Sequence, residues 1–265
     1  MPDWLHLERD GVHLACLDYG GSGSPILILP GLAAHAREWA ETASWLTDRG
    51  RVLVLDARGQ GHSERFPDDV SPEAHLADTA FVIEQLGIAP ATVIGHSIGG
   101  QRAIMLAGGR PELVRTLVVA DSGPGADDDA EAIVEAVRDD LASWPAPFES
   151  KEAAIEFFGG PSLKAEAWAD GLEERNGGWW PRWDLDLLER SLREAFVGRD
   201  YWREWESIRC PALAVRTLVG EDEHREMGER LPHAQLVPLG HSDHDLHLNH
   251  PEEWRRALTE FLDRI

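Results

Sequence analysis

Short apolar runs alternate along this chain with longer segments of mixed polar and apolar character. Four of the runs are rich in Ile, Val and Leu and end in turn-forming residues: "PILILPG" (25–31), "RVLVLDARGQG" (51–61), "ATVIGHS" (91–97) and "RTLVVADSG" (115–123). Such runs are typical of strands that are buried on both faces of a parallel sheet. The segments between them, about 36–49, 72–87 and 98–110, favour helices. This alternation predicts βαβ units.

Both ends of the chain add further strands to this pattern. Residues 3–19 form two alternating runs around Asp10-Gly11, which predicts a hairpin at a sheet edge. Towards the other end, "PALAVRTLV" (211–219) and "AQLVPL" (234–239) read as strands separated by a helix through "EHREMGERL". A terminal helix begins near Pro251, since proline suits a first helical turn. We therefore predict an α/β fold with a mostly parallel sheet of about eight strands flanked by helices.

The strand signal disappears between about residues 124 and 208. This stretch contains helical segments and many of the aromatic residues, including those of "RNGGWWPRW" (175–183). An insertion of this size in an α/β pattern is best interpreted as a helical cap, and caps commonly wall a pocket. We predict an α/β core at residues 1–123 and 206–265, with a helical cap subdomain at 124–205.

Composition and charge narrow the possible partners. Forty-eight acidic residues against 25 basic ones give a formal net charge of -23, which argues against binding to nucleic acid or to anionic membranes. We find no apolar stretch that approaches the length of a membrane span and no secretory signal at the start. Cys16 and Cys210 alone cannot form a disulfide framework. We expect a cytoplasmic protein that acts on a small molecule; its oligomeric state stays open.

The stretch "GHSIGG" places Ser97 between Gly95 and Gly99, at the point where a predicted strand becomes a helix. A serine hydroxyl is a weak nucleophile that needs exposure, a base and donors for the oxyanion. Glycines on both sides allow a sharp and strained turn that exposes the hydroxyl, and the following helix N-terminus favours negative charge. Ser97 is therefore the predicted nucleophile.

Together with "LPGLAAHAREW" (29–39), "DARGQGHS" (56–63) and "HDLHLNHPEEW" (244–254), this turn resembles the α/β-hydrolase family over nearly the full chain. The resemblance implies that the oxyanion hole is formed by the backbone N–H groups of Leu32 and Ile98. The family usually has His-Gly where this chain has Pro30-Gly31, a change that leaves the backbone donor intact.

The closing segment "LGHSDHDLHLNHP" offers four histidines: His241, His244, His247 and His250. Counting back from Pro251, the resemblance places the catalytic base at His244. The i, i+3 spacing could suggest a metal site, but a loop that ends in proline would not hold four imidazoles on one helical face. The glycine-rich turn carries a serine rather than a phosphate cradle. We predict no metal and no cofactor.

The acid that orients the histidine is less clear from the sequence. Most relatives carry it just after the strand written here as "PALAVRT", but the loop that follows is short, and helix capping explains Glu221 and Asp222. Asp121 follows the apolar run of the preceding strand and keeps the expected order of nucleophile, acid and base. Asp121 is the preferred acid, and Asp222 or Glu221 are the alternatives.

A serine nucleophile in this fold predicts acyl transfer. We expect hydrolysis of a small hydrophobic or aromatic carboxylic ester, lactone or thioester through an acyl-enzyme. The aromatic cap suggests four substrate contacts: Trp144, Trp179, Trp180 and Trp183. Two other classes stay open, a cofactor-free C–C bond hydrolase, lyase or perhydrolase, and a non-catalytic ligand receptor or scaffold.

Overall fold

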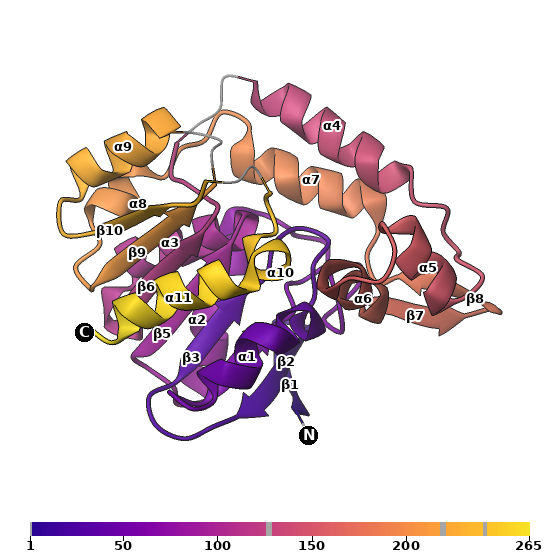
Figure 1. Cartoon of the computed structure of the whole chain (residues 1–265), viewed down its shortest axis with the longest axis horizontal. Coiled ribbons are helices and arrows are strands. Elements are labelled where there is room, and N and C mark those ends of the chain that lie inside the picture. The colour runs from indigo at the N-terminus through magenta and orange to yellow at the C-terminus, as the bar shows by residue number, and fades with distance from the viewer. Residues whose placement is uncertain (1, 126–128, 218–220, 241–242) are drawn as a thin grey trace.

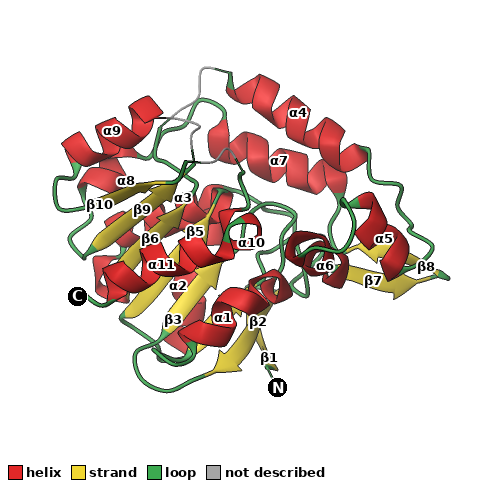
Figure 2. Ribbon diagram, in the orientation of Figure 1, coloured by secondary structure: helices red, strands yellow, loops and turns green. Residues whose placement is uncertain are grey.

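An eight-stranded sheet forms the centre of the protein (Figures 1 and 2). The computed structural model describes residues 2–125, 129–217, 221–240 and 243–265. In spatial order the strands are β1 (Asp3–Arg9), β2 (Val12–Gly20), β4 (Val52–Leu55), β3 (Ile26–Leu29), β5 (Ala91–His96), β6 (Val114–Ala120), β9 (Ala212–Arg216) and β10 (Gln235–Pro238). β1 and β2 are antiparallel at one edge, and the strands from β4 to β10 are parallel. The predicted fold class is confirmed.

The inner strands are apolar throughout because helices cover both faces of the sheet. Along β3, Leu27 and Leu29 point to one hydrophobic core while Ile26 and Ile28 point to the other. The first core is closed by α2 (Pro72–Gln85), α3 (Ile98–Gly109), α8 (Trp202–Glu206) and α9 (Glu221–Arg230). The second is closed by η1 (Ala36–Trp39), α1 (Ala40–Leu46), α10 (Leu246–Asn249) and α11 (Pro251–Leu262). A short 3-10 turn, η2 (Pro111–Leu113), precedes β6. Among the described residues, no helix has both the length and the apolarity for a membrane span.

The inserted segment covers one end of the sheet, where the parallel strands finish (Figure 1). Its helices are α4 (Ala130–Ala142), α5 (Lys151–Phe157), α6 (Leu163–Asp170) and α7 (Leu185–Phe196). It also contains a two-stranded antiparallel sheet, β7 (Leu172–Arg175) and β8 (Gly178–Pro181), beside α5 and α6 (Figure 2). The sequence pattern did not predict this hairpin, which the inserted segment contains in addition to its helices. Its turn residues, Asn176 and Gly177, both have positive φ, as two-residue hairpin turns require.

Gly99 lets the helix that follows Ser97 approach the sheet very closely. A Cβ atom on Gly99 would lie 2.2 Å from the carbonyl oxygen of Leu29 and 2.5 Å from that of Pro30, and neither backbone can yield easily. Gly109, at the other end of the same helix, has open space around its Cβ position.

We therefore expect Gly99→Ala to lower the free energy of unfolding by about 1–3 kcal/mol or more, the usual cost of overpacking. Gly109→Ala, the matched control, is expected to leave stability unchanged or to raise it by less than about 1 kcal/mol. Urea denaturation of both variants measures the difference. Equal stabilities would contradict the close approach of helix and sheet.

Candidate active site

Ser97 stands at the sharp turn between β5 and α3. Its backbone has φ 53° and ψ -127°, and its N–H donates to the Ala120 carbonyl on the neighbouring strand at 3.0 Å. Five described residues other than glycine have positive φ, and three of them, Ala33, Ser97 and Asp121, come from loops at this end of the sheet. Backbone strain of this kind persists only where the surrounding structure enforces it, and it is often associated with functional sites.

Asp121 and His244 are in direct contact. His244 Nδ1 lies 2.7 Å from Asp121 Oδ2, while Asp121 Oδ1 accepts hydrogen bonds from the backbone N–H and the hydroxyl of Thr217, both at 2.9 Å. The Asp121 side chain is 8% exposed and that of His244 is 54% exposed, so the imidazole is fixed on one edge and accessible on the other. This contact makes Asp121 the best placed of the three candidate acids.

The two alternative acids lie on the exposed surface of α9. Asp222 forms a salt bridge with Arg225 on the same helix, at 2.7 Å, and its side chain is 90% exposed. Glu221 is also exposed, and neither residue contacts His244 in the part of the chain that the structure describes. His241, the other histidine that follows a glycine in the closing segment, lies outside the described residues.

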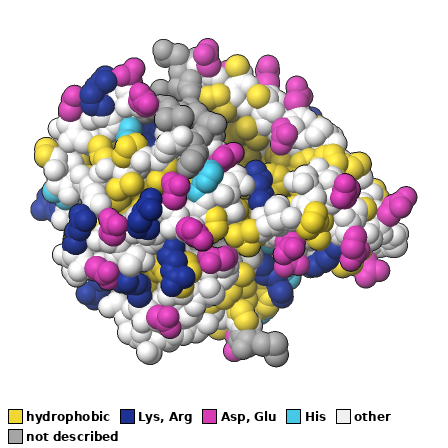
Figure 3. Space-filling view, viewed as in Figure 1, with side chains coloured by type: hydrophobic (Ala, Val, Ile, Leu, Met, Phe, Trp, Pro, Cys, Tyr) yellow, Lys and Arg dark blue, Asp and Glu magenta, His cyan; other side chains and the backbone are white. Residues whose placement is uncertain are grey.

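A cavity of about 530 Å³ opens between the end of the sheet and the inserted segment, and Ser97 and His244 both line it. Gly31 and Leu32 contribute from the loop after β3, and Ile98 begins α3, where its N–H has no partner within the helix. Apolar side chains form most of the opposite wall: Ile133, Ala136, Val137, Leu141, Trp144, Trp168, Trp183, Leu192 and Phe196. Apolar side chains gather around a hollow beside α4 and α7 in Figure 3.

The four predicted tryptophan contacts divide into two pairs. Trp144 and Trp183 line the cavity, and their rings meet edge to face at 5.4 Å. Trp179 and Trp180 do not line it. Trp179 packs against the small apolar cluster around Phe148 instead, and the Trp180 indole donates to the carbonyl of Arg175 at 3.0 Å. The expected substrate contact at these two positions is corrected, because contacts within the inserted segment hold both side chains outside the cavity lining. Trp168 lines the cavity without having been predicted.

The loop of "DARGQGHS" braces the site, and its Gly61 also lines the cavity. Asp56 is fully buried and accepts from the backbone N–H groups of Ala36, at 2.6 Å, and of His62, at 2.7 Å. It thereby ties the loop after β3 to the loop after β4. Arg58 forms its ion pair with Asp78 on α2, at 2.6 Å, and not with Asp56.

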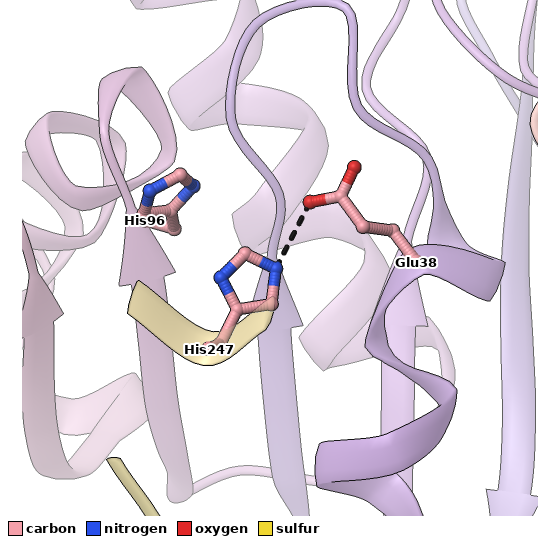
Figure 4. Close-up of side chains that lie close together, drawn as sticks. All are labelled: Glu38, His96 and His247. Carbon is pink, nitrogen blue, oxygen red and sulfur yellow. Dashed lines mark hydrogen bonds and ion pairs between the residues drawn. The ribbon is translucent and has the colours of Figure 1, made fainter. Parts of the chain in front are cut away.

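Glu38, His96 and His247 form a buried polar cluster, in which His96 directly precedes Ser97 in the sequence (Figure 4). His247 Nε2 lies 3.0 Å from Glu38 Oε1, and its ring stacks on Trp39 with a centroid separation of 4.0 Å. His96 Nε2 donates to the backbone carbonyl of His244 at 3.0 Å. The residue before Ser97 therefore holds the loop that carries the predicted base.

The same three side chains could in principle hold a metal ion, since one ligand atom from each lies within 4.8 Å of the others. Both Nε2 atoms are already used, however, and a metal bound through them would break the contact to His244. Burial lowers the pKa of His96 to about 3 and that of His247 to about 4, and it raises the pKa of Glu38 well above its usual value. These shifts favour the uncharged forms of the three side chains, and their hydrogen bonds brace the elements that carry them. No sequence spacing links Glu38 to His247, which lie 209 positions apart.

Comparison with known protein families decides where this chain belongs. The model of the "Alpha/beta hydrolase family" matches residues 26–257, a range that contains Ser97, Asp121 and His244. The chain belongs to the alpha/beta hydrolase family. The fold described above is the fold of this family, and the matched range includes the elements that carry these three residues.

Several relatives of this alpha/beta hydrolase match over almost its whole length. N-formylmaleamate deformylase of Pseudomonas putida is 30% identical over 280 residues, covering 97% of this chain and 96% of that protein. The sn-1-specific diacylglycerol lipase ABHD11 of Mus musculus is 28% identical over 268 residues, covering 93% and 83%. Among solved structures, E-2-(acetamidomethylene)succinate hydrolase superposes with a TM-score of 0.87 at 23% identity, covering 99% of this chain and 100% of that one, which supports the shared fold. These relatives are named as hydrolases, so hydrolase activity is supported for this chain.

Proposed function

We propose that this protein is a serine hydrolase that cleaves a small hydrophobic or aromatic carboxylic ester, lactone or thioester through an acyl-enzyme. The observation that carries the proposal is the His244–Asp121 contact of 2.7 Å at a cavity that Ser97 also lines. The nucleophile Ser97 would then come from the end of β5, and the acid Asp121 from the end of β6. The base His244 would come from the loop before α10. This is the constellation by which a hydroxyl is activated for acyl transfer.

Each group has a distinct role in the proposed reaction. His244 takes the proton of Ser97 as the hydroxyl oxygen attacks the substrate carbonyl, and Asp121 stabilises the imidazolium that forms. The backbone N–H groups of Leu32 and Ile98 stabilise the tetrahedral oxyanion. Collapse of this intermediate expels the alcohol or thiol, which receives the proton from His244. Water, deprotonated by the same imidazole, then attacks the acyl-enzyme and releases the carboxylic acid.

The shape and chemistry of the cavity support a substrate of modest size. A volume of about 530 Å³ is within the range of small-molecule sites, and aliphatic and aromatic side chains form most of its wall. Trp144, Trp168 and Trp183 offer broad apolar surfaces opposite Ser97. An aromatic or branched acyl group would bury more of this surface than an acetyl group does.

The test is turnover of p-nitrophenyl esters and of a thioester of graded acyl length, combined with covalent labelling by a fluorophosphonate. We expect turnover that increases with acyl size, and labelling confined to Ser97 as located by peptide mass spectrometry. Labelling with very slow ester turnover would favour a C–C bond hydrolase, lyase or perhydrolase. Tight ligand binding without labelling or turnover would favour a receptor.

The proposed base also fixes the direction of the pH dependence. Desolvation lowers the pKa of His244, but the hydrogen bond and the charge of Asp121 outweigh it and raise the pKa above its usual value of about 6.5. Because only the neutral imidazole can accept the proton, kcat/KM should fall as the pH drops through a midpoint above about 6.5. A pH series with a p-nitrophenyl ester, followed at the isosbestic wavelength of the product, measures the midpoint. A midpoint well below 6 would contradict this environment for the base.

A further inference from the structure

One cationic side chain interrupts the apolar wall of the cavity. Among the described residues that line it, Arg182 is the single lysine or arginine. It follows β8 directly and lies between two other lining residues, Pro181 and Trp183. On a protein of net charge -23, an arginine at a mainly apolar cavity needs an explanation.

The backbone around Arg182 is held in place by a second arginine. Arg65 Nη2 donates to the carbonyls of Pro181, at 3.1 Å, and of Trp183, at 3.4 Å, which bracket Arg182 on both sides. Arg65 also pairs through Nη1 with Glu173 Oε1, while the second oxygen, Glu173 Oε2, lies 3.2 Å from Arg182 Nη1. Two guanidinium groups thus share the one carboxylate of Glu173.

The Arg182 guanidinium retains unused hydrogen-bonding capacity. Its side chain is 28% exposed, and within the described part of the chain its salt bridge with Glu173 is accompanied by no hydrogen bond from its several N–H donors. The acidic residues that line the cavity do not take up this capacity. Glu38 is paired with His247 at 3.0 Å, Asp245 is paired with Lys164 at 2.8 Å, and Asp140 is an exposed residue of α4.

We propose that Arg182 is the anchor for a carboxylate on the substrate, at a point in the cavity distinct from the reacting carbonyl. The preferred substrate is then an ester, lactone or thioester whose acyl or leaving group bears a carboxylate. This assignment rests on the proposed hydrolase function and narrows its substrate class. A planar guanidinium matches a carboxylate through paired hydrogen bonds.

The overall charge of the protein makes such an anchor specific. The acidic surface repels anions in general, so an anionic substrate gains affinity only from a local cation that it reaches inside the cavity. The apolar wall around Trp144 and Trp183 excludes water from that contact and strengthens it relative to an exposed ion pair. A neutral ester of the same size fills the cavity without forming the contact.

The experiment compares mono-p-nitrophenyl esters of succinate, glutarate and adipate with their methyl p-nitrophenyl diesters, which are neutral. For at least one chain length, we expect kcat/KM of the wild-type protein to be about 10-fold or more higher for the acid. Arg182→Gln should remove this preference by lowering kcat/KM for the acid while leaving that for the diester within about 2-fold. Arg182→Lys should retain part of it.

Arg175→Gln is the matched control, because this substitution removes the same charge from the same hairpin. Arg175 does not line the cavity. The variant should keep the full preference. Ser97-dependent turnover of the diesters without any preference for the acids would overturn the role of Arg182 and leave the hydrolase proposal standing. An equal loss on both substrates in Arg182→Gln, with unchanged fluorophosphonate labelling, would also overturn it. Absence of turnover of every ester would count against the hydrolase proposal itself.

Discussion

Ser97→Ala is expected to lower kcat for p-nitrophenyl ester hydrolysis by about 10⁴-fold or more, as loss of the nucleophile does in other serine hydrolases. The Ser97 side chain is the attacking group, and alanine removes only its oxygen. The cavity and the His244–Asp121 contact should therefore persist. Stopped-assay kinetics at high enzyme concentration measure the residual rate, and intact-protein mass spectrometry shows whether fluorophosphonate still adds.

Ser191→Ala is the control for this variant. Ser191 is a buried serine of α7 that does not line the cavity, and its hydroxyl lies 3.4 Å from His75 Nε2. Its loss should leave kcat and labelling within a few-fold of the wild-type values. A Ser97→Ala protein that keeps a tenth or more of the activity would exclude the acyl-enzyme route.

Asp121→Asn is expected to lower kcat by about 10⁴-fold while the fold is retained. The reason lies in the second oxygen of this side chain, which accepts two hydrogen bonds from Thr217. An asparagine keeps its carbonyl oxygen towards those donors, so its NH₂ group faces His244 Nδ1. The imidazole then carries its proton on Nε2, the nitrogen that must accept the proton of Ser97, and the base is blocked.

Asp222→Asn tests the alternative acid with the same chemical change. Asp222 is exposed and paired with Arg225 on its own helix, so we expect kcat within about 2-fold of wild type. Circular dichroism melting of both variants separates a loss of fold from a loss of chemistry. If Asp222→Asn loses activity and Asp121→Asn keeps it, the acid is Asp222 and not Asp121.

The fold was predictable because its strands are short, apolar and punctuated by turn residues. Runs such as "PILILPG" carry apolar residues on both faces, which only a covered parallel sheet accommodates. The hairpin of β1 and β2 was found from Asp10-Gly11, whose two residues have φ 52° and 80°. The same signal at Asn176-Gly177 was missed because the aromatic residues beside it were interpreted as part of a helical cap.

The parts of the site that the sequence did not predict depend on contacts between distant segments. The pairing of Glu38 with His247 joins η1 to α10, and no local pattern marks either residue as a partner of the other. Arg58 pairs with Asp78 on α2, which lies 20 positions further along the chain, and no local pattern marks this pair either. The hairpin that carries Trp179 and Trp180 was not predicted, so the sequence did not show that neither of them lines the cavity.

The backbone conformation at Ser97 has a consequence for how this sequence can change over evolutionary time. A serine with φ of 53° costs about 1–3 kcal/mol, out of the roughly 5–15 kcal/mol that separate a folded domain from its unfolded chain. Asp121, with φ 43°, adds a second cost of the same kind. Selection for thermal robustness alone would favour glycine at both positions. A hydroxyl and a carboxylate in these two conformations therefore lower the stability of the fold, a cost that only a benefit other than stability can offset.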